Sequence, residues 1–230
     1  MTMDLLSFAR GPALQYALIV FVFGALWRLI GVLLLATKPD HSEPRNRARW
    51  KGLRLIVLRF WPRREFAARN AATHALGYVF HVGFFVVLLF YLPHVLFLED
   101  LFKPLFGGNL TQLTGMSWPY VSGGVIMMSG AVTVAALVAL LVHRIASPVK
   151  RLISNFDDYF SWLVTTAPLV TGMLAYAHLG APYQTLLAVH ILSVELLLVW
   201  FPFGKLMHSF TIFIARGVTG MSFERKGAAL

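Results

Sequence analysis

Histidine is the side chain with the most scope for chemistry in this sequence. Of eight histidines, His74, His81 and His94 fall in one long apolar run, and His190 and His208 fall in or directly after another. Ionisable groups are costly inside a membrane span and by default indicate function there. The chain has no cysteine, which excludes disulfides, thiolate metal sites and cysteine-held iron–sulfur clusters. Any redox metal must therefore be held by histidine.

The spacing of four of these histidines predicts two facing pairs. His190 and His208 are 18 residues apart, which is about five helical turns, so both project from one helix face about 27 Å apart. On an antiparallel helix, His94 comes level with His190, and His81 lies on the side of His208. Imidazole is an axial ligand of haem iron, and helix bundles hold cofactors between facing helices. The pattern predicts two stacked b-type haems, one held by His81 and His208 and the other by His94 and His190.

Alternatives to this reading stay open at the level of the sequence. A single histidine in a membrane often only hydrogen-bonds a neighbouring helix. His74 shares a helix face with His81, seven residues away, and is the rival ligand on the cytoplasmic side. His81 and His94 differ by about 220° of rotation on an ideal helix, so they do not share a face. The prediction therefore requires Pro93 to distort the last turn and re-aim His94.

The elements that must position these histidines are membrane-spanning helices. Hydrophobic residues make up 58% of the 230-residue chain, its mean hydropathy is +0.70 and only 13% of its residues are charged. A water-soluble domain is about half apolar, so this composition excludes one. Five continuous apolar runs are long enough to cross about 30 Å of hydrocarbon, namely residues 12–36, 71–98, 117–143, 160–178 and 183–204. We therefore expect one all-α domain over residues 1–230, an integral membrane bundle of five helices.

The distribution of Lys and Arg predicts how the bundle is oriented. The connection 37–70 carries ten of them: Lys38, Arg45, Arg47, Arg49, Lys51, Arg54, Arg59, Arg63, Arg64 and Arg69. The same side holds Arg144, Lys150, Arg151, Lys205, Arg216, Arg225 and Lys226, whereas the opposite side has Arg10 and Lys103. The positive-inside rule then places the N-terminus outside and the C-terminus in the cytoplasm. Because topology explains the formal net charge of +10, we expect no nucleic-acid partner.

Other features of the connections and spans have mainly structural interpretations. The longest connection is 34 residues, too short for a sizeable soluble domain, so we expect a separate cytoplasmic partner. Within it, residues 53–61 (LRLIVLRFW) interleave two Arg with apolar residues and predict an interfacial helix or a docking strip. Ser154 and Asp157 have the spacing of a capping box that opens the fourth helix. The small residues of the third helix allow close packing of a neighbouring helix or a flat ligand.

Two charged residues lie inside the predicted spans. Glu195 is the only acid in them, and an ion pair with Arg28 of the first helix is the favoured interpretation. A proton relay or a quinone contact are the alternatives for Glu195. Arg28 has two alternatives of its own, which are to reach the cytoplasmic face or to neutralise a haem propionate.

Several motifs resemble a known family. The run 201–208 (FPFGKLMH), preceded by His190, is similar to the last helix of the gamma subunit, a membrane cytochrome b, of respiratory nitrate reductase. The run 80–83 (FHVG) resembles its second-helix ligand motif, and 147–151 (SPVKR) its connection after the third helix. The resemblance covers most of the chain and implies that His81, His190 and His208 are haem ligands. The fourth family ligand falls on Tyr91, for which we substitute His94.

The resemblance also implies a function. Pro93 with His94, and the stretch 157–159, are closer to the related cytochromes that accompany heterodisulfide-reductase-like and dissimilatory sulfur-metabolism complexes. We expect a di-haem cytochrome b of a bacterial or archaeal cytoplasmic membrane, which moves electrons between quinone and a cytoplasmic iron–sulfur or molybdoenzyme subunit. Its quinone site is expected near the outer pair, with Tyr91 and either Glu99 or Asp100 as contacts. The alternative function is a non-redox membrane anchor that docks a cytoplasmic enzyme subunit.

Overall fold

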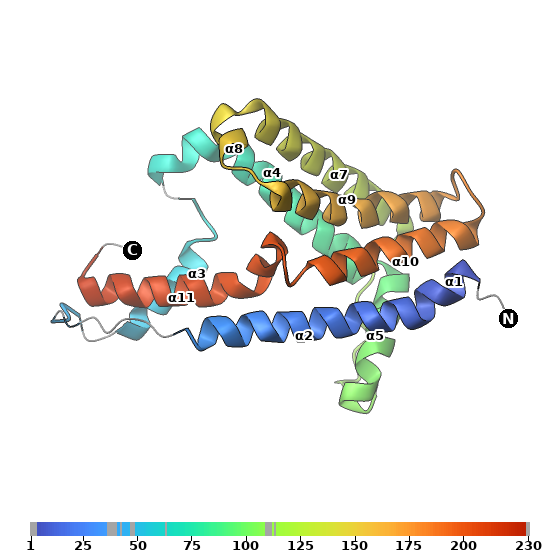
Figure 1. The fold of residues 1–230 in the computed structure, drawn as a ribbon, viewed down its shortest axis with the longest axis horizontal. Helices are drawn as coiled ribbons and strands as arrows, with labels where there is room; N and C mark the ends of the chain where they lie inside the picture. The colour runs from blue at the N-terminus through green and yellow to red at the C-terminus, as the bar shows by residue number, and fades with distance from the viewer. Residues whose placement is uncertain are drawn as a thin grey trace. The chain divides into compact units, whose positions relative to one another are not determined.

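The fold is known from a computed structural model, which describes residues 4–35, 41, 43–46, 49–62, 64–108, 112 and 114–228 (Figure 1). Every regular element among these residues is helical, and Tyr91 and Val121 form an isolated β-bridge. Ala36, where the first predicted span ends, and Lys38, Arg47 and Arg63 of the basic connection lie outside the described residues. The all-α fold class is confirmed.

Five helices are long and apolar enough to cross a membrane, as the sequence predicts: Leu5–Leu33, Ala67–Phe90, Gly123–Ala146, Phe156–Ala177 and Tyr183–Trp200. The first combines α1 (Leu5–Phe8), the π-helical turn η1 (Ala9–Ala13) and α2 (Leu14–Leu33). The others belong to α4 (Arg64–Phe90), α7 (Gly123–Ala146), α9 (Phe156–Ala177) and α10 (Tyr183–Trp200). The predicted boundaries of the second and third spans were wrong, because the helix that was expected to run to residue 98 stops at Phe90 and the helix expected from residue 117 begins at Gly123.

The remaining elements are short or lie in the connections. They are η2 (Arg49–Arg54), α3 (Leu55–Leu58), α5 (Leu92–Phe106), α8 (Pro148–Leu152), η3 (Lys205–Met207) and α11 (His208–Lys226). The chain forms two compact units. The first unit comprises Met1–Ala71, Asn155–Val164 and Ile191–Leu230, and the second comprises Ala72–Ser154 and Thr165–His190.

Small residues set the helix packing of the second unit. A Cβ at Gly83 of α4 would collide with the hydroxyl of Thr133 on α7, so this glycine lets the two helices approach closely. The Thr133 hydroxyl donates to the Ser129 carbonyl at 2.6 Å and is thereby satisfied away from water. A Cβ at Gly130 would lie 3.3 Å from the sulfur of Met173 on α9. Small residues of α7 therefore do serve helix packing.

In the first unit, α2 packs against the turn that follows α10. A Cβ at Gly24 would lie 2.6 Å from the ring of Pro202, so only glycine admits this proline. The Phe21 ring meets the Phe201 ring edge-on, with centroids 5.2 Å apart. Phe210 of α11 completes the cluster, with its ring centroid 5.7 Å from that of Phe201.

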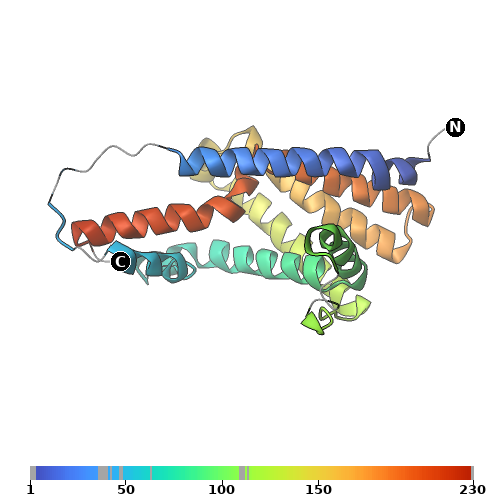
Figure 2. The ribbon, with the colours of Figure 1, turned by 90° about the horizontal axis from the view of Figure 1, so that it is seen from below.

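The basic strip at residues 53–61 folds onto α11 in the same unit, and Figure 2 shows η2 and α3 alongside this helix. The backbones of Gly52 and Gly220 touch, and neither position has room for a Cβ. Arg216 donates to the Ile56 carbonyl at 3.2 Å, and its guanidinium lies 4.7 Å from the centroid of the Phe60 ring. The strip therefore packs against the C-terminal helix on one side, while nearby apolar side chains such as Val57 and Trp61 stay exposed.

The predicted capping box of Ser154 and Asp157 was wrong by one residue. The α9 helix opens at Phe156, and Asn155 caps it, because the Asn155 N–H donates to Asp158 at 3.0 Å and the Asp158 N–H donates to the Asn155 side chain at 3.4 Å. Ser154 is engaged elsewhere, since its hydroxyl donates to the Lys150 carbonyl at 2.7 Å. Asp157 is consequently available to other partners.

Candidate functional site

The candidate site begins where α4 breaks. Tyr91 adopts an extended conformation (φ −81°, ψ 122°), and α5 starts at Leu92 with Pro93 in its first turn. Since proline has no N–H, the Leu89 carbonyl lacks its helical donor. The Trp118 indole N–H replaces that donor and donates to the Leu89 carbonyl at 2.7 Å. The sequence correctly singled out Pro93 as a distortion, but the outcome is a break between two helices and not a bent last turn.

The break brings His94 against His190, as the sequence predicts for the outer pair. The two imidazole rings are nearly parallel, with an interplanar angle of 17° and centroids 6.0 Å apart. Both side chains are half-buried in the second unit. Two histidines that are 96 residues apart in sequence therefore meet on facing elements.

Each ring of this pair is anchored through its Nδ1 nitrogen. His94 Nδ1 donates to the Val87 carbonyl at 2.9 Å, and His190 Nδ1 lies 3.3 Å from the Thr171 hydroxyl oxygen. The Thr171 hydroxyl donates to the Ala167 carbonyl at 2.7 Å, so it accepts from His190. Hydrogen bonding at Nδ1 selects the tautomer whose lone pair is on Nε2, which is how proteins orient metal-binding histidines.

Gly172 makes room for the His190 ring on α9. A Cβ at this position would lie 3.0 Å from His190 Cε1 and 3.2 Å from Nδ1, which is tighter than ordinary packing allows. Gly172, Thr171 and Trp118 were not predicted from the sequence. Gly172 could have been predicted, because it and His190 lie at similar distances from the turn that joins α9 and α10. The roles of Thr171 and Trp118 depend on contacts that no local pattern specifies.

His94 and His190 are the residues that would hold a haem here. If one metal ion were bound between the two imidazoles, with metal–nitrogen bonds of about 2 Å, the ring centroids would lie roughly 6 Å apart. The two centroids lie 6.0 Å apart in the structure. Among the described residues, no group of three or more His, Cys, Asp or Glu gathers to hold a metal ion by itself. A haem needs only two protein ligands, so this pair is of the required kind.

Burial also favours the ligand form of His94, which lies beyond the end of the second span. Removal from water lowers the pKa of its imidazole, and the hydrogen bond to the Val87 carbonyl acts in the opposite direction more weakly. A neutral imidazole is the form that binds metal.

Tyr91 lies beside this pair. Its ring meets the His94 ring edge-on with centroids 5.0 Å apart, and its centroid is 6.1 Å from that of Tyr176. Burial, and secondarily Tyr183 and Tyr176, raise the pKa of the Tyr91 phenol, so it stays a hydrogen-bond donor. Glu99 and Asp100 lie about two turns farther along α5, roughly 12 Å from Tyr91 along the axis, and the structure does not bring them to the phenol.

The other predicted ligands lie on separate units. His81 is on the α4 part of the second unit, with Nδ1 donating to the Gly77 carbonyl at 2.7 Å. His208 opens α11 in the first unit, with Nδ1 donating to the Lys205 carbonyl at 2.8 Å. His74, the rival of His81, lies two turns earlier on α4, and all three side chains are exposed. The pairing of His81 or His74 with His208 stays a prediction.

The favoured ion pair between Glu195 and Arg28 does not form. Both residues lie in the first unit and are described. Glu195 is buried, with 6% of its surface exposed, and its Oε1 has no hydrogen-bond partner among the residues that the structure describes. Arg28 is exposed on α2. The physical reason is that equal depth on two helices does not place two side chains on facing sides, and Arg28 projects outward from α2.

The fold and the paired histidines define a multi-pass, all-α membrane protein with a two-imidazole site. A protein of Nitratidesulfovibrio vulgaris strain Hildenborough, named simply "Protein", is 31% identical over 229 residues, which covers 96% of this chain and 94% of the relative. The chain belongs to the same family as this relative, whose name describes no activity. No family model matches the chain. No solved structure matches it either.

Proposed function

We propose that this protein is a di-haem cytochrome b, the membrane subunit of an oxidoreductase complex. It exchanges electrons between the quinone pool and a cytoplasmic iron–sulfur or molybdoenzyme subunit. The observation that carries the proposal is the His94–His190 pair, with parallel rings 6.0 Å apart and both Nδ1 nitrogens anchored to oxygen atoms. A pair that only stabilised helix packing would have no need for this combined spacing, angle and tautomer.

In this proposal the chain's residues hold and orient two haems. His94 and His190 are the ligands of the outer one, and His81 and His208 those of the cytoplasmic one. When bound, haem supplies one-electron transfer at a potential that its ligands and their hydrogen bonds tune. All four histidines donate Nδ1–H to oxygen, and this shared arrangement supports a shared role. Arg28 is proposed to neutralise a haem propionate.

Quinone is proposed to bind beside the outer pair. The Tyr91 phenol remains protonated and donates a hydrogen bond to a quinone carbonyl oxygen. Either Glu99 or Asp100, which lie two turns farther along α5 and do not touch Tyr91, is proposed to take up a proton after quinol has released it and to pass it to the outside. When quinol is the electron donor, protons leave outside while electrons cross inward, so turnover in that direction is electrogenic, worth about 2.3 kcal/mol per charge at 100 mV.

The partner is proposed to meet the basic surface formed by η2, α3 and α11. Exposed Lys51 and Arg54 and half-buried Arg59 lie there or beside it, next to the exposed apolar Val57 and Trp61. Such a surface complements an acidic protein with an apolar centre. From the positive-inside rule we expect this side to face the cytoplasm, and we propose that the membrane is the cytoplasmic membrane of a bacterial or archaeal cell.

A spectrum of the purified protein tests the proposal. We expect a reduced-minus-oxidised difference typical of b-type haem and two haems per chain by quantitative extraction. A folded but colourless protein would overturn the proposal and leave the non-redox membrane anchor. A firm ratio of one haem would remove one of the two histidine pairs, and the His190→Ala spectrum would show which.

A further inference from the structure

The segment that precedes His208 is held by a network of polar contacts at the start of α9. Lys205 lies in η3, three residues before His208, and its carbonyl accepts the His208 Nδ1–H at 2.8 Å. The orientation of the imidazole therefore depends on where the Lys205 backbone is. All the residues that hold Lys205 belong to the first unit.

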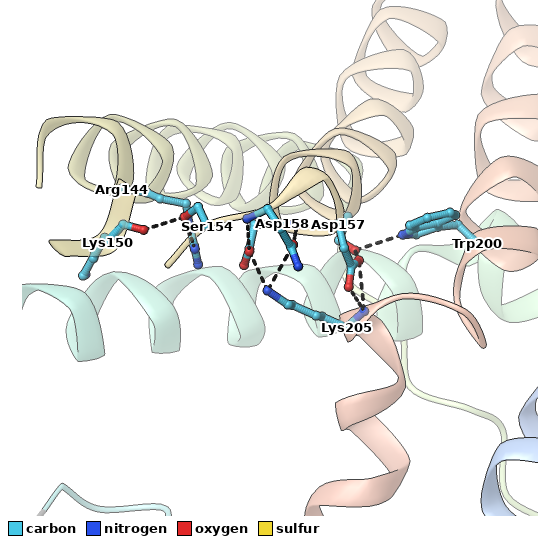
Figure 3. A network of polar contacts seen from close by, with 9 residues as sticks. Arg144, Lys150, Ser154, Asp157, Asp158, Trp200 and Lys205 are labelled. Atoms are coloured by element: carbon cyan, nitrogen blue, oxygen red, sulfur yellow. Dashed lines mark hydrogen bonds and ion pairs between the residues drawn. The ribbon is translucent and has the colours of Figure 1, made fainter. Parts of the chain in front are cut away.

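Asp157 fixes the Lys205 backbone directly. The Lys205 N–H lies 3.2 Å from Asp157 Oδ1 and 3.1 Å from Oδ2, so it donates to the carboxylate as a whole (Figure 3). Hydrogen bonds to ionised groups are shorter and about twice as strong as neutral ones. The same carboxylate accepts from the Ser161 hydroxyl at 2.6 Å, and Ser161 accepts from the Trp200 indole at 3.0 Å.

The neighbouring Asp158 makes a different contact with the same lysine. It forms an ion pair with the Lys205 ammonium group, which also donates to the Asn155 side-chain oxygen at 3.5 Å. The Asp158 side chain is 6% exposed, whereas that of Lys205 is 51% exposed. Asp157 thus holds the backbone of Lys205 and Asp158 holds its side chain, which separates the two carboxylates in function.

Gly204 is required for this approach. A Cβ there would collide with the Trp200 indole nitrogen and would lie 2.9 Å from Asp157 Oδ1 and 3.0 Å from Ser161 Oγ. Pro202, two residues earlier, has no N–H, and the N–H groups of Phe203 and Gly204 both donate to the Trp200 carbonyl at 3.0 Å. The N–H of Lys205 is the next along the chain, and Asp157 accepts from it.

We propose that Asp157 is a positioning residue that fixes the His208 imidazole through the backbone of Lys205. This inference rests on the proposed function in that His208 is a haem ligand. The carboxylate holds the Lys205 N–H, the Lys205 carbonyl holds His208 Nδ1–H, and the ring plane and tautomer of His208 follow from both. Partners of metal-binding histidines of this kind tune the metal as well as orient the ligand.

The first test compares Asp157→Asn with Asp158→Asn in the full-length, haem-loaded chain. Asparagine at 157 removes the charge and one of the two acceptor oxygens facing the Lys205 N–H. In Asp157→Asn we expect a shift in the midpoint potential and in the low-spin EPR signal of the haem that His208→Ala abolishes. The other haem should be unchanged. Asp157→Glu, which keeps the carboxylate, should give a smaller shift than Asp157→Asn. Asp158→Asn should leave both haems as in the wild type. Equal shifts of both haems, no shift, or the same shift in Asp158→Asn would overturn the proposal.

The second test needs no haem and so separates this inference from the proposed function. In haem-free protein in micelles with ¹⁵N-labelled histidine, we expect His208 to show a single tautomer protonated at Nδ1. Asp157→Asn should turn this signal into an average of both tautomers, whereas Asp158→Asn should not. If the wild type binds no haem, the proposed function fails, and the His208 signal still decides whether Asp157 positions the ring. An unchanged tautomer in Asp157→Asn would contradict positioning in either case.

Discussion

Two helix breaks, each containing a proline, place a histidine in this protein, and they hold it by different chemistry. At the α4–α5 break, Pro93 immediately precedes His94. At the α10–α11 break, Pro202 lies six residues before His208. In both places the histidine Nδ1 donates to a carbonyl of a nearby residue, Val87 or Lys205.

The surroundings of the two breaks differ. Around His94 the partners are backbone carbonyls, an indole and aromatic rings, and the carbonyl released by Pro93 is satisfied by Trp118. Around His208 they are two aspartates, a lysine and a serine. Burying a hydrogen-bonded neutral group away from water costs little free energy, whereas a charged group is stable only where it is paired or near water. A proline break can therefore orient a histidine in either setting, provided that the backbone groups it leaves unpaired find partners suited to that setting.

Removing either histidine of the buried pair should produce the largest effect. We expect His190→Ala and His94→Ala each to lose one of two haems and to leave the second spectrum unchanged, because the second haem is proposed to be held by His81 and His208. Haem quantification and redox titration measure this. His143→Ala, at the end of α7, is the matched control and should keep both haems. Loss of both haems in His190→Ala would show that the two sites are not independent.

Three glycine substitutions compare the two breaks directly. Gly172→Ala crowds the His190 ring and should weaken haem retention at the outer pair about 10- to 100-fold, the usual cost of disturbing a ligand's support. Gly204→Ala should disturb only the His208 haem, because its Cβ meets Asp157, Ser161 and Trp200. Gly124→Ala meets nothing within 4 Å and serves as the control. The assignment of glycines to sites is wrong if Gly172→Ala and Gly204→Ala affect the same haem.

The Trp118 indole should stabilise the α4–α5 break. Trp118→Phe leaves the Leu89 carbonyl without this donor, which costs about 1–3 kcal/mol of unfolding free energy when the group is buried. Thermal or detergent unfolding of the purified protein measures the loss. Trp27→Phe, on an exposed part of α2, should cost far less. Equal stability of the two variants would mean that water satisfies the Leu89 carbonyl.

Tyr91 should give the smallest effect. Tyr91→Phe removes one neutral hydrogen bond, worth about 0.5–1.5 kcal/mol, so we expect the KM for quinol to rise about 3- to 10-fold. Both haem spectra should stay as in the wild type, since the phenol is not a ligand. Steady-state oxidation of a soluble quinol analogue measures the change. A Tyr120→Phe variant, exposed in the connection after α5, is the control. An altered haem spectrum with unchanged KM would instead give Tyr91 a role at the haem.

Much of this architecture was predictable because apolar length and helical spacing are local properties. The five spanning helices follow from runs of hydrophobic residues that must satisfy their backbone in lipid. The depth match of His94 and His190 follows from counting residues along antiparallel helices. The end of the second span was predicted eight residues too late, at residue 98 instead of Phe90. The run stays hydrophobic across the break, so hydropathy does not indicate it, and the missing N–H of Pro93 is the one local sign.

What the sequence by itself determined is therefore the all-α class, the number of helices long and apolar enough to cross a membrane, and the residue types able to hold a redox metal. Only the tertiary structure decided which groups satisfy the breaks: Trp118 at Leu89, Thr171 at His190, and Asp157 at Lys205. The structure also shows that Glu195 and Arg28 form no ion pair and that Asn155, not Ser154, caps α9. The physical reason is that helix formation depends on neighbours in sequence, whereas a hydrogen bond between distant segments depends on the rotation and register of packed helices, which a hydropathy pattern does not specify.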